Sequence, residues 1–300
     1  MIEPMADQLN LRKTDNVAEN KRDGFIWQIL SNSKARAGLI IFIIFAIIGI
    51  LGPFLSPYSP YDTKFADWLP PSSAHLLGTD YIGHDLLSWY LYGTGTSLYV
   101  GASVAIIATL IGTAVGLISG YYGGITDNLL MRTVDIFLIL PTFPLLVILS
   151  AYLPPKTSTT ILILSFLSWP FMSRVIRSQI LTLKEQPFID AARLAGLSGS
   201  RIMFGELFKH ILPLIIINAV YLMVGAIVAQ AGLAFFGLGN LNSINWGTSL
   251  YWAQTEDAIV YRAWWWIVPP GLSIALVGIA ANLFGSGVNE AIGKESGEVR

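Results

Sequence analysis

The stretch AGLIIFIIFAIIGILGPFL at residues 37–55 carries no charged residue and consists mainly of Ile, Leu and Phe. As a helix rising about 1.5 Å per residue, it is long enough to cross a hydrocarbon core about 30 Å thick. In the whole 300-residue chain, hydrophobic residues make up 54% and charged residues only 12%, which is too apolar for a soluble domain. The sequence therefore predicts an all-α, polytopic membrane protein.

Five further apolar runs follow the first one. Pro141 and Pro144 interrupt the third run, and Gly120–Gly124 form a tight turn before it, so that the third helix runs antiparallel to the second. Six crossings would place both termini on the same side of the membrane. The predicted membrane helices cover residues 37–55, 97–119, 129–152, 157–173, 211–236 and 264–286.

The distribution of positive charge predicts the orientation of these helices. Lys64, Lys156 and Arg262 fall on one predicted side, and the other 15 of the 18 Lys and Arg residues fall on the opposite side. By the positive-inside rule, both termini face the cytoplasm and the chain is a multi-pass protein of the cell membrane. The predicted division is a cytoplasmic tail at 1–36, a six-helix membrane domain at 37–288 with an extracytoplasmic segment at 56–96 and a cytoplasmic loop at 178–210, and a second cytoplasmic tail at 289–300.

The sequence carries no enzymatic signature. It contains no cysteine and no His-Glu-x-x-His or Gly-x-Ser-x-Gly motif, and Gly293-Lys294 lacks the glycine spacing of a phosphate-binding loop. The charges are spread over short loops, which argues against nucleic-acid binding. The apolar runs also carry no ionisable group away from their ends, unlike most secondary transporters. Energy for uphill transport would then come from another subunit.

The longest charged, helix-forming stretch between two apolar runs covers residues 190–213. Pro187 and Asp190 are suited to the start of a short helix, and Gly196 is suited to its end. Ser198 or Ser200 could cap a second helix from Arg201 to His210. Two short helices joined by a bend would form a rigid docking element for a partner protein at the membrane surface.

A second polar stretch, residues 75–85, contains two histidines and two aspartates. A metal site is one interpretation, but no histidine pair at helical i, i+4 spacing and no cysteine ligand supports it. The other interpretation is a turn in which Gly78, Thr79, Asp80 and Gly83 supply positive φ angles and side-chain caps, and this one is favoured. No metal site is predicted elsewhere.

Two patterns within the apolar runs predict contacts between or along helices. Gly112, Gly116 and Gly120 are spaced so that a second helix can approach closely, although glycine is also common in membrane helices in general. Arg132 and Asp135 are three residues apart and are expected to pair on one helix face, in preference to a proton-relay role.

The pattern Asp190-Ala191-Ala192-x-x-x-Gly196, followed by Ile211-Leu212-Pro213, resembles the cytoplasmic EAA loop of the membrane subunits of binding-protein-dependent ABC importers. Three further motifs resemble the C-type permease subunit of the dipeptide and oligopeptide branch. They are Leu77-Gly78-Thr79-Asp80-x-x-Gly83-x-Asp85, Gly120-Tyr121-Tyr122-Gly123-Gly124 and Gly232-Leu233-x-Phe235-x-Gly237-Leu238-Gly239. Together these motifs span most of the chain.

The resemblance implies the permease fold of a type I ABC importer. The implied partners are a homologous permease, one or two cytoplasmic ATPases that bind ATP and Mg, and an extracytoplasmic binding protein, while this chain binds no cofactor. The resemblance also implies that one segment contacts an ATPase through Asp190, Ala191, Ala192, Arg193, Gly196 and Arg201.

Two departures from the family pattern concern the polar stretches. His84 stands where arginine is common, and fourteen residues separate Gly196 from Ile211, about one helical turn more than usual. The implied cargo is peptide, with oligosaccharide or nickel as alternatives, and the rival class is a secondary carrier or membrane scaffold. Asn218, Gln230 and Asn282 are the candidates to line the pathway, although they could also form hydrogen bonds between helices.

Overall fold

The computed structural model describes residues 30–295, and in that part of the chain the secondary structure is helical, with no strand beyond one isolated bridge between Thr79 and Asp85. The predicted tails, residues 1–36 and 289–300, lie partly outside the described residues. The helices are α3 (Ser33–Leu55), α4 (Leu86–Tyr122), α5 (Gly124–Ile139), α6 (Thr142–Tyr152), α7 (Thr157–Leu183), α8 (Pro187–Leu194), α9 (Gly199–Arg201), a π-helical turn (Ile202–Leu207), α10 (Phe208–Phe235), α11 (Trp246–Thr255) and α12 (Trp264–Glu295).

Five helices are long and apolar enough to cross a membrane, and α5 with α6 makes a sixth crossing if the two are counted as one broken span. These two helices meet at an angle of 83° on either side of Leu140 and Pro141. This bend confirms the break predicted from the prolines. It arises because proline lacks a backbone N–H donor and because the residue before a proline avoids helical geometry. The all-α, polytopic fold is thus confirmed.

The structure corrects several predicted boundaries. The second membrane helix begins at Leu86 rather than at residue 97, because the Asp85 carboxylate accepts a hydrogen bond from the Ser88 backbone and caps α4 there. The fourth continues to Leu183 rather than ending at residue 173. Arg174 and Arg177 remain inside that helix because acidic residues of α5 pair with them.

The long helices α4 and α7 pack closely through the predicted glycine face. A Cβ atom at Gly112 would lie 2.6 Å from the Met172 Cβ, and one at Gly116 would lie 2.6 Å from the Ser173 carbonyl oxygen. Only a residue without a side chain fits at such an approach. The interpretation of these glycines as a helix-packing face is confirmed.

The predicted pair between Arg132 and Asp135 is wrong. Asp135 pairs with Arg174 of α7, and Asp127 receives two hydrogen bonds of 2.6 Å from the Arg177 guanidinium. Sequence spacing places Arg132 and Asp135 on one face of α5, but the neighbouring helix presents better-placed cations. These bidentate and single contacts attach α5 to α7.

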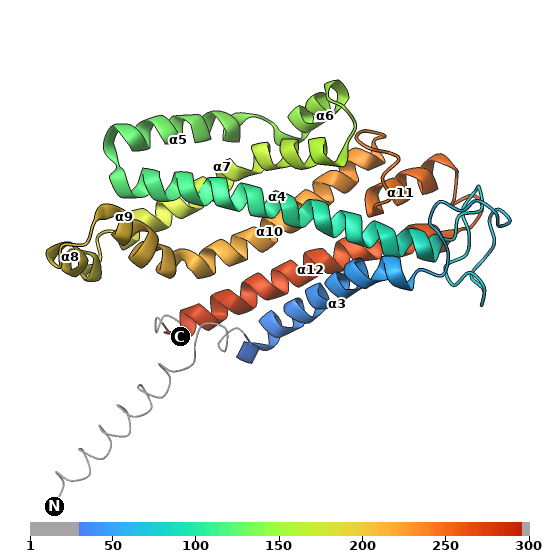
Figure 1. The fold of residues 1–300 in the computed structure, drawn as a ribbon, viewed down its shortest axis with the longest axis horizontal. Helices are drawn as coiled ribbons and strands as arrows, with labels where there is room; N and C mark the ends of the chain where they lie inside the picture. Colours follow the sequence, from blue (N-terminus) through green and yellow to red (C-terminus); the bar gives the residue numbers. More distant parts are fainter. Residues whose placement is uncertain (1–29, 296–300) are drawn as a thin grey trace, which may run out of the picture.

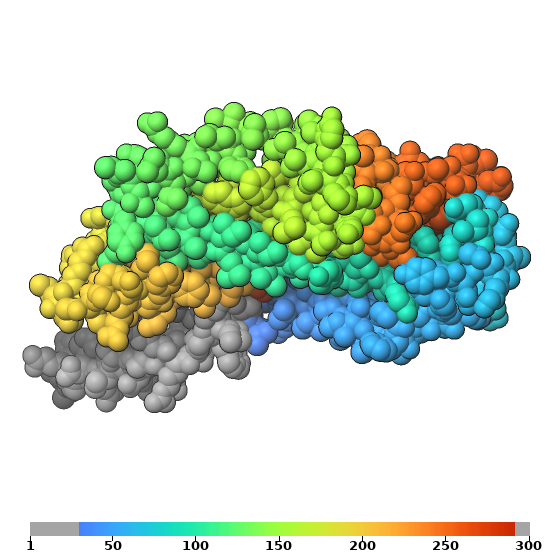
Figure 2. All heavy atoms as spheres, turned by 45° about the horizontal axis from the view of Figure 1, so that its top comes forward, coloured from blue at the N-terminus to red at the C-terminus, as the bar shows by residue number. Residues whose placement is uncertain are grey.

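Figure 1 places α8, the start of α3 and the end of α12 at one end of the helix bundle, and the segment 56–85 with α11 at the opposite end. We call these the α8 end and the loop end. At the α8 end, Lys34 and Asn32 both contact the Glu290 carboxylate, which joins α3 to α12. The space-filling view in Figure 2 shows the α8 segment (yellow) protruding from its end, far from residues 56–85 (light blue).

Candidate functional site

Helix α8 is held against the bundle by its apolar residues. Pro187 is its first residue, as predicted, and Ile189 is fully buried in a cluster that includes Ile180 of α7 and Leu207 of the π-helical turn. Ala192 is buried on the same face, and the Phe188 ring stacks on His210 with centroids 4.5 Å apart. The helix is therefore a packed element and not a free loop.

The opposite face of α8 is open to solvent. The Leu194 side chain is 90% exposed, and it stands beside Asp190 and Arg193, which pair with each other at 3.1 Å. Ala191 is also exposed. An exposed leucine beside a paired carboxylate and guanidinium, on a helix whose other face is packed, is suited to contact with a partner protein.

Gly196 ends α8 by its backbone conformation. Its φ angle is +76°, and the Leu197 N–H donates to the Ala192 carbonyl at 3.1 Å, as in a glycine-terminated helix. A Cβ atom at Gly196 would meet no atom within 4 Å, so the left-handed conformation and not a close contact favours glycine. Ser198 then accepts a hydrogen bond from the Arg201 N–H and caps the next helix, as predicted.

The second, separate loop helix predicted from Arg201 to His210 is wrong. Helix α9 continues through the π-helical turn into α10, so that residues 199–235 form one continuous helix. Ile202, Met203, Leu207 and Ile211 are buried against α7 and α8, and this packing keeps the segment helical. The loop predicted at 178–210 shrinks to α8 and the short connections 184–186 and 195–198. Arg201 lies at the start of the long helix, apart from the face of α8.

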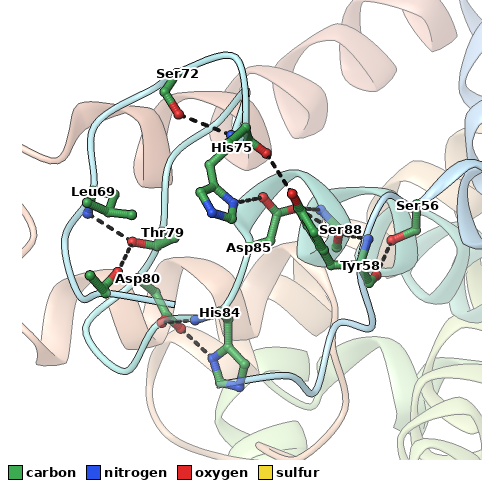
Figure 3. A network of polar contacts seen from close by, with 12 residues as sticks. Ser56, Tyr58, Leu69, Ser72, His75, Thr79, Asp80, His84, Asp85 and Ser88 are labelled. Carbon is green, nitrogen blue, oxygen red and sulfur yellow. Dashed lines mark hydrogen bonds and ion pairs between the residues drawn. The ribbon is translucent and has the colours of Figure 1, made fainter. Parts of the chain in front are cut away.

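At the loop end, the polar stretch 75–85 is arranged as two separate pairs (Figure 3). The His75 Nδ1 lies 2.9 Å from Asp85, and the His84 Nδ1 lies 2.6 Å from Asp80. Among the side chains that the structure describes, residues 30–291, no three His, Asp or Glu groups converge in a way that could hold a metal ion. His84 supplies Asp80 with a partner at the position where the family pattern has arginine.

The turn interpretation of this stretch is confirmed by the backbone. Gly78 and Gly83 have φ angles of +68° and +84°. Thr79 is fully buried, and its hydroxyl donates to the Ala66 carbonyl at 2.7 Å while it accepts from the Leu69 N–H. Asp80 and Asp85 are fully buried as well. The stretch thus forms a closed hydrogen-bonded loop over the start of α4.

Replacement of Gly83 by alanine is expected to destabilise this loop. The added Cβ would overlap the Phe65 carbonyl oxygen at a positive φ angle, which combines overpacking with backbone strain and costs about 3 kcal/mol or more. Gly123→Ala is the control for backbone strain without overpacking, because Gly123 has φ +66° and ψ −158° with no atom within 4 Å; such strain alone costs about 1–3 kcal/mol. In limited proteolysis of the purified variants, Gly83→Ala should be cleaved within residues 56–85 much faster than Gly123→Ala. Equal cleavage would contradict this assignment.

Comparison with known proteins identifies the family. Residues 112–295 match the family of binding-protein-dependent transport system inner membrane components, and residues 23–71 match the N-terminal membrane domain of oligopeptide transport permease C. The oligopeptide transport system permease protein OppC of Mycobacterium tuberculosis is 34% identical over 94% of this chain and 97% of its own length. The dipeptide transport system permease protein DppC of Haemophilus influenzae is 33% identical over 89% and 92%. This chain belongs to the family of binding-protein-dependent transport system inner membrane components.

The match at both ends of the chain makes it a C-type permease of the peptide ABC importer branch. In this permease the α8 segment and the long helix that follows it both fall inside the larger matched region, 112–295. The chain is therefore a membrane component of a peptide ABC importer, the class that the sequence motifs implied. Whether α8 contacts an ATPase stays a prediction from the motif.

The three candidate pathway residues lie in different surroundings in the permease. The amide nitrogens of Asn218 and Asn282 donate to carbonyls of their own helices, Leu214 at 2.8 Å and Gly278 at 3.2 Å. Among the described residues, neither of these two amide nitrogens donates to another helix. Gln230 is buried and lines a small polar cavity with Thr160 and Asn245.

Sequence reasoning missed helix α11, which it treated as loop. The Asn245 side chain accepts from the backbone of Gly247 and Thr248, and the Thr248 hydroxyl accepts in return from the Asn245 N–H at 3.0 Å. This capping box was the available signal. The helix buries Trp246, whose indole N–H donates to the Thr94 hydroxyl of α4 at 3.1 Å.

Proposed function

We propose that this chain is the membrane subunit of an ATP-driven importer and forms half of a translocation pathway for peptides delivered by an extracytoplasmic binding protein. Its partners are a homologous permease and cytoplasmic ATPases, which bind ATP and Mg. In this proposal both termini and the α8 end face the cytoplasm, and residues 56–85 with α11 face the outside. The peptide relatives named above support peptide as the cargo class.

The observation that carries the proposal is the architecture of α8. A helix with a buried base at Ile189, an exposed Leu194 and a glycine-fixed end is suited to contact a partner at the end of the bundle where α3 begins and α12 ends. Asp190, Ala191, Ala192, Arg193 and Gly196 belong to this element, and Arg201 follows it at the start of the long helix. ATP-driven closure of the ATPases would then move the membrane helices through α8.

Gly196→Val tests this coupling. A β-branched residue in the left-handed conformation is strained by about 2 kcal/mol or more, and the strain is relieved by moving α8 relative to the long helix. We expect ATP-dependent peptide uptake in proteoliposomes to fall at least about tenfold, a loss that corresponds to 1.4 kcal/mol or more, with normal insertion and subunit assembly. Uptake by each variant is measured in the same assay, with the binding protein present.

Gly196→Asn is the matched control, because asparagine tolerates positive φ better than other residues with a side chain. Its uptake should stay close to that of the unaltered protein. Unchanged transport in Gly196→Val would contradict the coupling role. Uptake that persists without any ATPase subunit would instead favour the rival class, a secondary carrier, and transport of oligosaccharide in place of peptide would revise the cargo alone.

A further inference from the structure

A pocket of about 270 Å³ opens at the loop end, between the segment 56–85, the first turn of α4 and the chain leading into α11. Its wall includes four aromatic side chains, Tyr61, Tyr81, Trp89 and Trp252. Small-molecule sites in proteins usually have volumes of about 300–1,000 Å³, so this pocket suits a group about the size of one amino-acid residue. The α8 segment has no part in it.

A buried negative charge lies in the wall of this pocket. Asp80 is fully buried and accepts hydrogen bonds from the Ile82 N–H at 3.0 Å, the His84 N–H at 2.8 Å and the His84 ring. Burial and the negative charges of Glu256 and Asp80 raise the pKa of the Tyr81 phenol. The residues lining the pocket include no lysine or arginine. The pocket therefore favours a positively charged ligand.

The loop end as a whole has the same sign of charge. Its segments 56–85, 153–156 and 236–263 contain six acidic residues and three basic ones. Two of these acids, Asp80 and Asp85, are buried beside His84 and His75, so the excess of acidic residues at the surface is small. The charge preference of the pocket therefore comes from Asp80 in its wall.

His84 adds a directed hydrogen-bond acceptor. In the neutral tautomer that carries its hydrogen on Nδ1, His84 donates to the Asp80 carboxylate, and the Nε2 atom of that tautomer is an acceptor. Figure 3 shows the Nδ1 side of the ring turned toward Asp80 and the opposite edge turned away from it. Within residues 30–295, the Nε2 atom has no hydrogen-bond partner.

We propose that this pocket binds the N-terminal ammonium group of a peptide. The ammonium would lie against the aromatic rings, where a cation gains about 0.5–2 kcal/mol, and would donate a hydrogen bond to the His84 Nε2 atom. The choice of a peptide as the source of the ammonium rests on the proposed function. A basic side chain of the binding protein is the other source of this chemistry, and the experiment separates the two.

The test uses the full-length chain in lipid nanodiscs, together with any subunits that accompany it. Equilibrium dialysis measures the binding of radiolabelled tri-alanine and of N-acetyl-tri-alanine, which has the same backbone without the ammonium. We expect the free peptide to bind at least about tenfold more tightly than the acetylated one. Trp252→Leu should weaken its binding about tenfold, and Tyr61→Leu about threefold, as expected for the loss of one cation–π contact.

Two further variants control for folding. Trp252→Phe keeps an aromatic ring and should retain most of the affinity. Trp264→Leu is the same type of replacement at an exposed tryptophan that does not line the pocket. It should leave the affinity for tri-alanine unchanged. Tyr61 is itself exposed, so its replacement is not expected to disturb the core.

Equal binding of the two peptides, or unchanged binding in both Trp252→Leu and Tyr61→Leu, would overturn the proposal. If these variants weaken docking of the binding protein but not of tri-alanine, the ammonium comes from that protein and the peptide assignment is wrong. Absence of ATP-driven uptake by the unaltered transporter would contradict the proposed function and not this binding measurement. The two inferences therefore fail on different results.

Discussion

Leu194→Asp is expected to abolish binding of the ATPase and, with it, peptide uptake. Burial of a leucine side chain contributes about 1.5–3 kcal/mol, and a carboxylate in the same contact adds a desolvation cost and is an i, i+4 neighbour of Asp190 on α8. A total of about 3 kcal/mol or more corresponds to a loss of at least about a hundredfold in affinity. The measurement is co-purification of the ATPase with tagged permease, followed by uptake in proteoliposomes.

The folded state should tolerate this change, because Leu194 is almost fully exposed. Leu76→Asp is the matched control, since Leu76 is also an exposed leucine but lies at the loop end. It should leave ATPase binding intact. Leu194→Met, which keeps the apolar surface, should also bind. ATPase recovery equal to that of the unaltered protein in Leu194→Asp would show that α8 is not the contact.

Gly116→Val is expected to prevent correct packing of α4 on α7. The first added carbon would lie 2.6 Å from the Ser173 carbonyl oxygen and 2.8 Å from the Ile176 Cβ. Both helices are long and held by neighbours on other sides, so neither can move away without disturbing further contacts. Overpacking of this kind costs about 3 kcal/mol or more. Heating in detergent followed by size-exclusion chromatography should show a clear drop in the temperature at which monodisperse protein is lost.

Ala114→Val is the control, because it introduces valine into the same helix, α4, at a position that does not face α7. Ala114 is exposed, so a larger side chain there meets no close-packed neighbour. We expect its thermal stability to match that of the unaltered protein. A drop as large as that of Gly116→Val would assign the loss to α4 itself and not to its contact with α7.

The sequence predicted those features that depend on local chemistry. The apolar run at 37–55 marked a membrane helix, Pro141 marked the break between α5 and α6, and the spacing of Gly112, Gly116 and Gly120 marked the face that packs on α7. In the docking segment, Pro187, Gly196 and Ser198 marked the start, the end and the next cap correctly. Each of these signals acts within a few residues.

The errors arose where a distant partner decides the outcome. Arg174 and Arg177 looked like the polar end of a helix, but Asp135 and Asp127 of α5 pair with them and the helix continues. Residues 202–211 looked like a surface helix because of their charges, yet their apolar face is buried against α7 and α8. The pocket beside Asp80 is formed by segments about 150 residues apart in the chain, so no local pattern could reveal it.

The unbroken helix from Gly199 to Phe235 has a mechanical consequence. At about 1.5 Å per residue its 37 residues form a lever arm roughly 55 Å long. The π-helical turn at 202–207 and Pro213 lie close to its base beside α8, and such features are the usual places where a helix bends. A small rotation at the base would therefore be magnified along the arm. This rotation would produce a larger displacement at Phe235, where the chain turns toward α11 and the pocket at the loop end.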